Sequence, residues 1–437
     1  MIKIAMASLG CAKNSVDAEN MLGILTVNGC EIVGDESEAD VIIVNTCCFI
    51  NDAKQESIDT IIDLARNKTE GKCRRLIVSG CLAERYKDEI INELPEVDVV
   101  VGVGHIGDIM EAVNGGEKSV MASRPYYHPE SERVRITPPY TAYLKIADGC
   151  DNRCTYCIIP SVRGSFNSRP VETLVAEARE LARQGVKELI IVAQDSTKYG
   201  VDLPGEPSLA QLVSRLCEVD GIEWIRLHYC YPERITDELI DVIASEAKVC
   251  KYLDIPIQHC NKEVLRKMGR KGSKDTLAAA IGKIRARIPG ITLRTTIIVG
   301  FPTETDEQYS ELAEFVREMK FARLGVFTYS QEEGTPAAKM SGQIDEEVKE
   351  RRREMLMLAQ ADVSDELSAA KEGTTIRVLV EGYDAIVKQY YGRSEADSAE
   401  IDGKVFFTSK MAVKEGTFTD VIIENSMDCD LFGRIAE

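Results

Sequence analysis

Three cysteines, Cys150, Cys154 and Cys157, lie close together in the spacing C-x3-C-x2-C. Thiolates bind zinc and iron–sulfur clusters, and an odd number of them cannot pair completely as disulfides. A structural zinc site normally has four ligands and would show a second cysteine pair further along the chain, which is missing here. A cubane cluster held by three thiolates keeps one iron open for a small ligand. We therefore expect an iron–sulfur site, with a zinc or structural cysteine site as the alternative.

Length and composition set the context for these thiols. The chain has 437 residues and fourteen cysteines, which predicts two to three domains. It contains no apolar run long enough to span a membrane, and its first residues lack the features of a signal peptide. We expect a cytoplasmic protein with no membrane association. The reducing cytosol disfavours structural disulfides, so clustered thiols there favour metal binding or redox chemistry.

The elements that must position the cysteines begin with a domain of alternating strands and helices. Strand patterns at residues 2–8, 41–45, 76–79 and 97–101 are separated by helical patterns. This order predicts an open, mostly parallel α/β domain over residues 1–115. Glycines and prolines in residues 116–138 predict a linker.

A second alternating series follows in residues 139–340. Six strand patterns with intervening helices predict a (β/α)6 partial barrel, because a closed eight-fold barrel would need a longer chain. Residues 341–371 predict one long connecting helix. Residues 372–437 predict a small antiparallel β-barrel. The six barrel strands are expected at residues 143–147, 189–193, 224–227, 253–257, 294–299 and 325–329.

Catalytic groups on β/α barrels collect at the carboxyl ends of the strands. Cys150, Cys154 and Cys157 follow the first barrel strand. Five further residues at such ends are candidates for a cofactor or substrate pocket. The alternative for each is a purely structural role; His259, for example, could be a hydrogen-bonded core histidine. These candidates are Gln194, Asp195, Gln258, His259 and Gly300.

Three cysteines of the first domain also follow strands. Cys11, Cys47 and Cys81 come after the first, second and third predicted strands, so they should meet at one edge of a parallel sheet. Cys48 competes with Cys47, and we prefer Cys47 because adjacent residues rarely point into one site. The alternative is that these cysteines are buried apolar side chains.

Several motifs resemble those of a known family. The stretch DGCDNRCTYCIIPSVRG resembles the signature of radical S-adenosylmethionine enzymes, and SLGCAKN, NTCCFI, SGCL and IIVGFPTET are similar to the methylthiotransferases among them. The terminal barrel resembles a TRAM domain. The resemblance implies a 4Fe–4S cluster on Cys150, Cys154 and Cys157 that binds S-adenosylmethionine. It also implies a second 4Fe–4S cluster, on the first-domain cysteines, that delivers sulfur.

The family divides by substrate, and charge favours one branch. The chain has a formal charge of −19, and residues 371–437 hold eight Lys and Arg against thirteen Asp and Glu. An RNA-binding barrel should be basic, whereas an acidic surface suits a basic ribosomal protein. VAQDSTKYG and YSQEEGTPAA resemble the branch that modifies the β-carbon of an aspartate in ribosomal protein uS12. Direct RNA binding is not expected to dominate.

Two alternatives remain open. One is methylthiolation of a tRNA adenosine carrying an N6-isopentenyl or threonylcarbamoyl group, which is the other branch of the family. The other is a non-catalytic iron–sulfur or RNA-binding module. The resemblance further implies a sulfur donor and a flavodoxin-like electron donor, but it assigns no catalytic side chain in this sequence.

Overall fold

The computed structural model describes residues 1–115, 118–120 and 133–436. Its first part is a six-stranded parallel sheet in the order β2-β1-β3-β4-β5-β6, which confirms the predicted open α/β fold. Most of the expected linker lies outside the described residues. The strands are β1 (Lys3–Ser8), β2 (Glu31–Ile32), β3 (Val41–Thr46), β4 (Arg75–Gly80), β5 (Val99–Val101) and β6 (Ser119–Val120). The helices are α1 (Ala12–Val27), α2 (Asn51–Ala65), α3 (Cys81–Arg85), α4 (Lys87–Glu93) and α5 (Ile109–Asn114).

The central part is an open sheet of six parallel strands in the order β14-β13-β12-β11-β10-β7, as expected for a (β/α)6 partial barrel. Its strands are β7 (Thr141–Lys145), β10 (Glu188–Val192), β11 (Trp224–Leu227), β12 (Val249–Asp254), β13 (Thr292–Val299) and β14 (Arg323–Thr328). A short ribbon of β8 (Ala147–Asp148) and β9 (Asn167–Ser168) follows β7. The helices are α6 (Ile159–Arg163), α7 (Val171–Arg183), α8 (Leu209–Cys217), α9 (Asp237–Ser245), α10 (Lys262–Lys267), α11 (Lys274–Arg287) and α12 (Asp306–Met319).

The fourth barrel strand begins earlier than the sequence pattern predicts. The expected range was 253–257, whereas β12 spans Val249–Asp254. The apolar run continues after the strand ends, because Ile255 and Ile257 are buried as the chain leaves the sheet. The apolar run therefore indicates which residues are buried, not which residues pair with a neighbouring strand.

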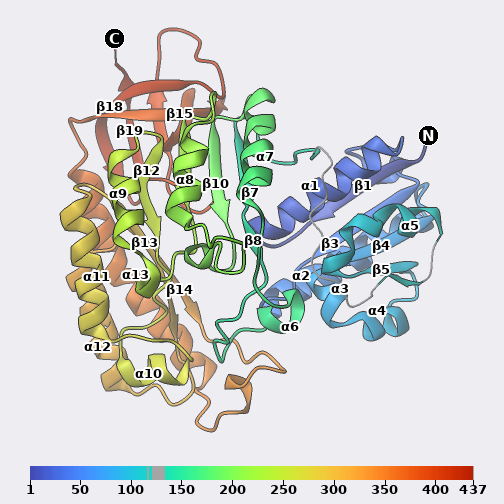
Figure 1. Cartoon of the computed structure of the whole chain (residues 1–437), viewed down its shortest axis with the longest axis horizontal. Coiled ribbons are helices and arrows are strands. Elements are labelled where there is room, and N and C mark those ends of the chain that lie inside the picture. The colour runs from blue at the N-terminus through green and yellow to red at the C-terminus, as the bar shows by residue number, and fades with distance from the viewer. Residues whose placement is uncertain (116–117, 121–132, 437) are drawn as a thin grey trace.

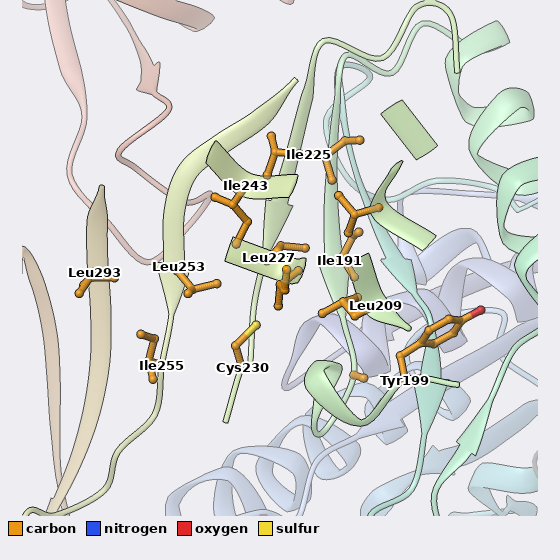
Figure 2. Packing of buried hydrophobic residues seen from close by; sticks show 14 of the residues in the cluster. Ile191, Tyr199, Leu209, Ile225, Leu227, Cys230, Ile243, Leu253, Ile255 and Leu293 are labelled. Carbon is orange, nitrogen blue, oxygen red and sulfur yellow. The ribbon is translucent and has the colours of Figure 1, made fainter. Parts of the chain in front are cut away.

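The main core lies between the sheet and the helices that cover it. Figure 2 shows Ile191, Leu227 and Leu253 of three neighbouring strands packed near Leu209 of α8 and Ile243 of α9. Each of these side chains is buried, and burying one aliphatic side chain contributes about 1.5–3 kcal/mol. This packing fixes the strands whose carboxyl ends carry the candidate residues.

A long helix and a small closed barrel complete the chain. No helix in the described ranges is long and apolar enough to cross a membrane. The barrel has the strand order β15-β16-β17-β19-β18, and its β17–β19 pair is parallel while the other pairs are antiparallel. The sequence did not predict β19. These elements are α13 (Glu346–Ala369), β15 (Thr375–Asp384), β16 (Gln389–Ser394), β17 (Val405–Thr408), β18 (Phe418–Met427) and β19 (Asp430–Ile435).

The small barrel covers one end of the open sheet (Figure 1). It packs against the amino ends of the strands, where Trp224 contacts Phe418 with ring centroids 4.7 Å apart. The cysteine loop lies at the opposite, carboxyl ends.

One loop of the small barrel, residues 394–402, reaches the strands of the open sheet, and we call it the plug segment. Ser398 Oγ lies 2.8 Å from His228 Nε2, beyond the end of β11. Tyr252 of β12 donates to Asp402 at 2.7 Å. Because these side chains are mainly polar and buried, hydrogen bonds and ion pairs hold the two domains together at this contact.

Glu188 is the central acceptor between the sheet and the small barrel. It accepts hydrogen bonds from Arg226 Nε at 2.9 Å and from Arg393 Nη2 at 2.6 Å, and all three side chains are buried. Burial by itself would raise the pKa of Glu188, but the two guanidinium groups lower it to about 2. The carboxylate is thus ionised at neutral pH and compensates two buried cations.

Replacing Glu188 by alanine should destabilise this contact strongly. Glu188→Ala leaves Arg226 buried without its counter-ion and Arg393 with Glu381 alone, and breaking such a buried pair typically costs about 3–5 kcal/mol. Urea unfolding should show a lower midpoint. The exposed pair of Arg434 and Glu424 provides a control, and Glu424→Ala should change stability by less than about 1 kcal/mol. Equal effects of the two substitutions would contradict the assigned role.

His228 predicts an acid-sensitive fold. Burial and the nearby charge of Arg226 lower its pKa to about 4, although Asp254 opposes this, while an unfolded histidine titrates near about 6.5. Between these values the unfolded chain binds the extra proton, so stability falls as pH decreases from about 6.5 toward 4, by about 1.4 kcal/mol per unit from this group. Unfolding midpoints at pH 7 and 5.5 should therefore differ less for His228→Gln than for the unaltered chain. An unchanged difference would contradict this origin.

Candidate active site

The loop with Cys150, Cys154 and Cys157 is held by backbone and side-chain contacts at the carboxyl end of β7. Cys150 N–H donates to Gly164 O at 3.0 Å, which closes the loop. Asn152 N–H donates to Cys150 Sγ at 3.5 Å. Burial raises the pKa of Cys150, and it raises the pKa of Cys157 to about 12. The loop therefore presents desolvated thiols that need a metal centre to stabilise their thiolate forms.

The second set of thiols converges at one edge of the first sheet, as its strand positions predict. Cys11 directly precedes α1, Cys47 follows β3, and Cys81 is the first residue of α3. The charge of Cys11 acts on Cys47, and the charges of Cys11, Cys48 and Cys47 act on Cys81. The structure thus brings together Cys11, Cys47 and Cys81 from three separate strand ends.

Glycines allow this close approach. Gly10 and Gly80 each precede a cysteine and have φ of +92°, a region that disfavours other residues. A Cβ on Gly10 would lie 2.7 Å from Cys47 Cβ, and one on Gly80 would lie 2.5 Å from Thr46 O. Side chains at these two positions would push the neighbouring strands apart and separate the thiols.

Positive charge surrounds the second set. Burial by itself would raise the pKa of Cys11, but Lys13 and Arg163 outweigh it and leave this pKa below its usual value. Burial raises the pKa of Cys81 to about 12 although Arg163 opposes this shift. A cluster bound by three thiolates is anionic, so Lys13 and Arg163 would offset its charge in this buried place.

Cys47 and Cys48 have different surroundings. Cys47 lies against Gly10, beside Cys11. Cys48 is buried near Arg85 of α3, and burial raises its pKa to about 11. These positions favour Cys47 as the third thiol of the set and give Cys48 a structural place.

The two sets of thiols lie on neighbouring elements. The chain leaving Cys157 enters α6, and Ile158, just before α6, and Val162 of α6 pack in the same apolar cluster as Cys81 and Leu82 of α3. Figure 1 shows α6 beside α3, at the boundary between the first domain and the open sheet. The loop that carries Cys150, Cys154 and Cys157 therefore leads directly into the helix that packs beside Cys81.

A buried ionic array fixes this boundary, and it consists of Asp17 of α1, Lys145 of β7, Asp148 and Arg163. Arg163 donates to Asp148 at 2.8 Å and to Asp17 at 3.1 Å. Lys145 donates to Asp148 at 2.9 Å and also pairs with Asp17. Burial would raise the pKa of Asp148, but Arg163 and Lys145 hold it well below its usual range.

The donor sets suit iron–sulfur clusters. All fourteen cysteines are free thiols. Within the described residues, no group of three His, Cys, Asp or Glu side chains is placed to hold a metal ion. Each set holds two buried thiols and one half-buried thiol, and cysteine thiols are the donors that iron–sulfur clusters take.

Two of the expected pocket residues contact the cysteine loop. Gln194 donates to Asp148 at 2.9 Å. Asp195 is buried, accepts from Asn152 at 2.8 Å and pairs with Arg234. Both residues follow β10, and their hydrogen bonds to Asp148 and Asn152 fix the position of the loop that carries the thiols.

The other three expected pocket residues lie beyond β12 and β13. Gln258 has φ of +68°, and within the described residues its buried Oε1 has no hydrogen-bond partner. His259 Nδ1 accepts from Asn261 N–H at 2.9 Å, and burial with nearby Arg352 lowers its pKa to about 3. Its buried Nε2 has no hydrogen-bond partner within the described residues, so only one of the two ring nitrogens is paired. A Cβ on Gly300 would lie 2.3 Å from Lys349 Cγ, so this glycine makes room for α13.

Several residues of the site were missed by the sequence reasoning. Asp148 and Arg163 lie within the quoted cysteine motif, but nothing in the spacing indicates that they pair. Lys13 lies in SLGCAKN, and its Nζ is 3.6 Å from the centre of the Tyr229 ring. The signal in the sequence was the presence of charged residues within the cysteine motifs.

Comparison with known proteins identifies the family. Residues 3–102 match the model of the uncharacterized protein family UPF0004, residues 144–316 match the radical SAM superfamily, and residues 373–436 match the TRAM domain. The ribosomal protein uS12 methylthiotransferase RimO of Pelotomaculum thermopropionicum is 54% identical over 438 residues, covering 99% of each chain. That of Lachnoclostridium phytofermentans is 49% identical, also over 99% of each chain. The chain belongs to the RimO methylthiotransferase family. It is therefore a radical S-adenosylmethionine enzyme, and its family implies a 4Fe–4S cluster.

Solved structures support the fold alone. The radical S-adenosylmethionine methyltransferase TsrM from Kitasatospora setae, with cobalamin and a [4Fe-4S] cluster bound, matches with a TM-score of 0.55 at 14% identity. That match covers 77% of this chain and 73% of TsrM. The radical enzyme OxsB matches with a TM-score of 0.51 at 14% identity, over 82% of this chain and 56% of OxsB. Both likenesses agree with the domain arrangement described above.

The ionic array predicts that Arg163 couples the first domain to the open sheet. Arg163→Met removes the cation that Asp17 and Asp148 share with Lys145, and the loss should be about 3 kcal/mol or more. Hydrogen exchange of the cluster-free protein should then be faster in α1. Arg163→Lys keeps the charge without the two-pronged contact and should give an intermediate rate. Unchanged exchange in both variants would contradict this role.

Proposed function

We propose that this chain methylthiolates the β-carbon of an aspartate in ribosomal protein uS12, using S-adenosylmethionine and two 4Fe–4S clusters. The observation that carries this proposal is the placement of two sets of three thiols, two buried and one half-buried in each, on directly connected elements. The names of the relatives support uS12 as the substrate. The acidic C-terminal barrel supports a basic protein partner over RNA.

In this proposal Cys150, Cys154 and Cys157 hold one cluster, and Cys11, Cys47 and Cys81 hold the other. Bound there, the clusters and S-adenosylmethionine would supply a radical that activates an inert carbon and a methylated sulfur that the carbon receives. Separate sites are needed because radical generation and sulfur delivery are different reactions. A sulfur donor and a flavodoxin-like electron donor belong to the same proposal.

The side chains of this chain have three roles in the reaction. The thiols hold the reagents, and their burial keeps water away from reactive species. The ionic array and α6 fix the distance between the two sets, so that both reagents meet the same substrate carbon. Lys13 and Arg163 offset the negative charge that builds up at Cys11 and Cys81.

The assignment of the two sets can be tested by substituting the thiols of each set with serine. The triple variant of Cys11, Cys47 and Cys81 should contain about half the iron, still cleave S-adenosylmethionine under reductant, and yield no methylthiolated uS12. The triple variant of Cys150, Cys154 and Cys157 should lose cleavage as well. Cys48→Ser is the matched control for Cys47→Ser and should keep the full iron content. Loss of iron in Cys48→Ser alone would contradict the choice of Cys47.

The substrate is tested by offering uS12 and unmodified tRNA in parallel to the anaerobically reconstituted protein with S-adenosylmethionine, sulfide and reductant. Mass spectrometry should find a methylthio group on one uS12 aspartate. A methylthio group on a tRNA adenosine would instead support the other branch of the family. Cleavage of S-adenosylmethionine with neither product would leave the radical chemistry intact and reject both substrates.

A further inference from the structure

One short segment has a charge opposite to that of the whole chain. Residues 262–274, KEVLRKMGRKGSK, contain six Lys and Arg and one Glu, in a chain of formal charge −19. We call this stretch the basic segment. It comprises α10, the turn after it and the first residue of α11. Such a local reversal of charge attracts anionic partners to one place on the surface.

The basic segment lies directly on the loop that carries Cys154. Thr155 N–H donates to Met268 O at 2.9 Å, and Thr155 Oγ1 donates to Lys267 O at 2.8 Å. A Cβ on Gly269 would lie 3.6 Å from Cys154 Cα. Since Thr155 lies between Cys154 and Cys157, a partner bound to the segment lies close to the cysteine loop.

A cavity of about 260 Å³ connects this surface to the thiol. Cys154 lies on its wall, and Arg234, Arg270 and Lys271 contribute positive charge to its lining. Glu233 is the acidic residue among the lining residues. This one small, positively charged cavity therefore separates Cys154, a proposed cluster ligand, from the basic surface.

The charge of the segment is only partly compensated. Lys267 pairs with Glu263 at 3.4 Å, and Lys274 pairs with Glu318 at 3.1 Å. Arg266 and Lys271 are exposed, and neither forms an ion pair with any residue in the ranges 1–115, 118–120 and 133–436. Neighbouring cations without counter-ions repel one another, and an anionic partner would relieve that repulsion.

We propose that the basic segment is the docking surface for an acidic one-electron carrier protein that reduces the cluster on Cys150, Cys154 and Cys157. This inference rests on the proposed function, because it requires a redox-active cluster at those thiols. One electron passes from the reduced carrier to the oxidised cluster, and the carrier leaves oxidised by one electron. Electron transfer becomes slower with distance, so a docking surface in contact with the cluster loop suits this partner.

Charge by itself would also suit RNA phosphate, but the position favours the carrier. The segment packs on the cysteine loop through Thr155, which is where an electron carrier has to dock. An RNA partner would need a wider basic surface, and the small barrel, with eight Lys and Arg against thirteen Asp and Glu, does not extend it.

The test uses the full-length reconstituted protein and two reductants. Reduced flavodoxin is an acidic carrier protein, and dithionite is a small reductant that needs no docking surface. In Arg266→Glu with Lys271→Glu, the rate of S-adenosylmethionine cleavage driven by flavodoxin should fall about tenfold or more at low salt. The rate with dithionite should stay unchanged. Arg74→Glu with Lys414→Glu makes the same change of charge on the first domain and the small barrel, and it should affect neither rate.

The outcomes separate this inference from the proposed function. Equal flavodoxin-driven rates in the unaltered chain and in the Arg266 and Lys271 variant would overturn the docking surface. Loss of tRNA binding in that variant, with the flavodoxin rate unchanged, would assign the surface to RNA and also overturn it. If dithionite drives no cleavage in the unaltered chain, the proposed function fails. Calorimetry of flavodoxin binding would then test the docking surface by itself. About tenfold weaker binding in the variant would support the docking surface, and equal binding would overturn it.

Discussion

The buried pairing of Arg163 with Asp148 and Asp17 is the interaction on which the arrangement of the two thiol sets depends. It joins α1, which begins beside Cys11, to the strand and loop that carry the other set. Charges are expensive to bury, and they remain in the interior because each carboxylate has a cation at hydrogen-bond distance. An apolar contact would allow small shifts of one domain on the other. Directional ion pairs define a single position.

A second polar contact performs a similar task at the other end of the open sheet. Glu188 holds Arg226 and Arg393, and the plug segment adds hydrogen bonds to His228 and Tyr252. A six-stranded sheet that does not close leaves the polar side chains of its strands to be satisfied by another part of the chain. The small barrel supplies those partners, which ties a domain suited to macromolecular recognition to the enzyme core.

Much of the fold and of the candidate site followed from sequence patterns. The strand pattern at residues 41–45, between two helical patterns, predicted a parallel strand, and the structure places β3 there with all its residues buried. Strand ends then selected Cys11, Cys47 and Cys81, because parallel strands present their carboxyl ends at one edge. The pattern failed at β12, where an apolar run continued beyond the strand, and at β19, which was not recognised as a strand.

The sequence by itself determined the chemistry: the number and spacing of the thiols, the order of strands and helices, and the surplus of acidic residues are all local properties of the chain. Only the tertiary structure decided which groups act together. Asp17 and Arg163 are far apart in sequence, as are Glu188 and Arg393, and each pair meets in the interior. Such pairs carry no local signal, because an ion pair depends on distance in space while the sequence records only distance along the chain.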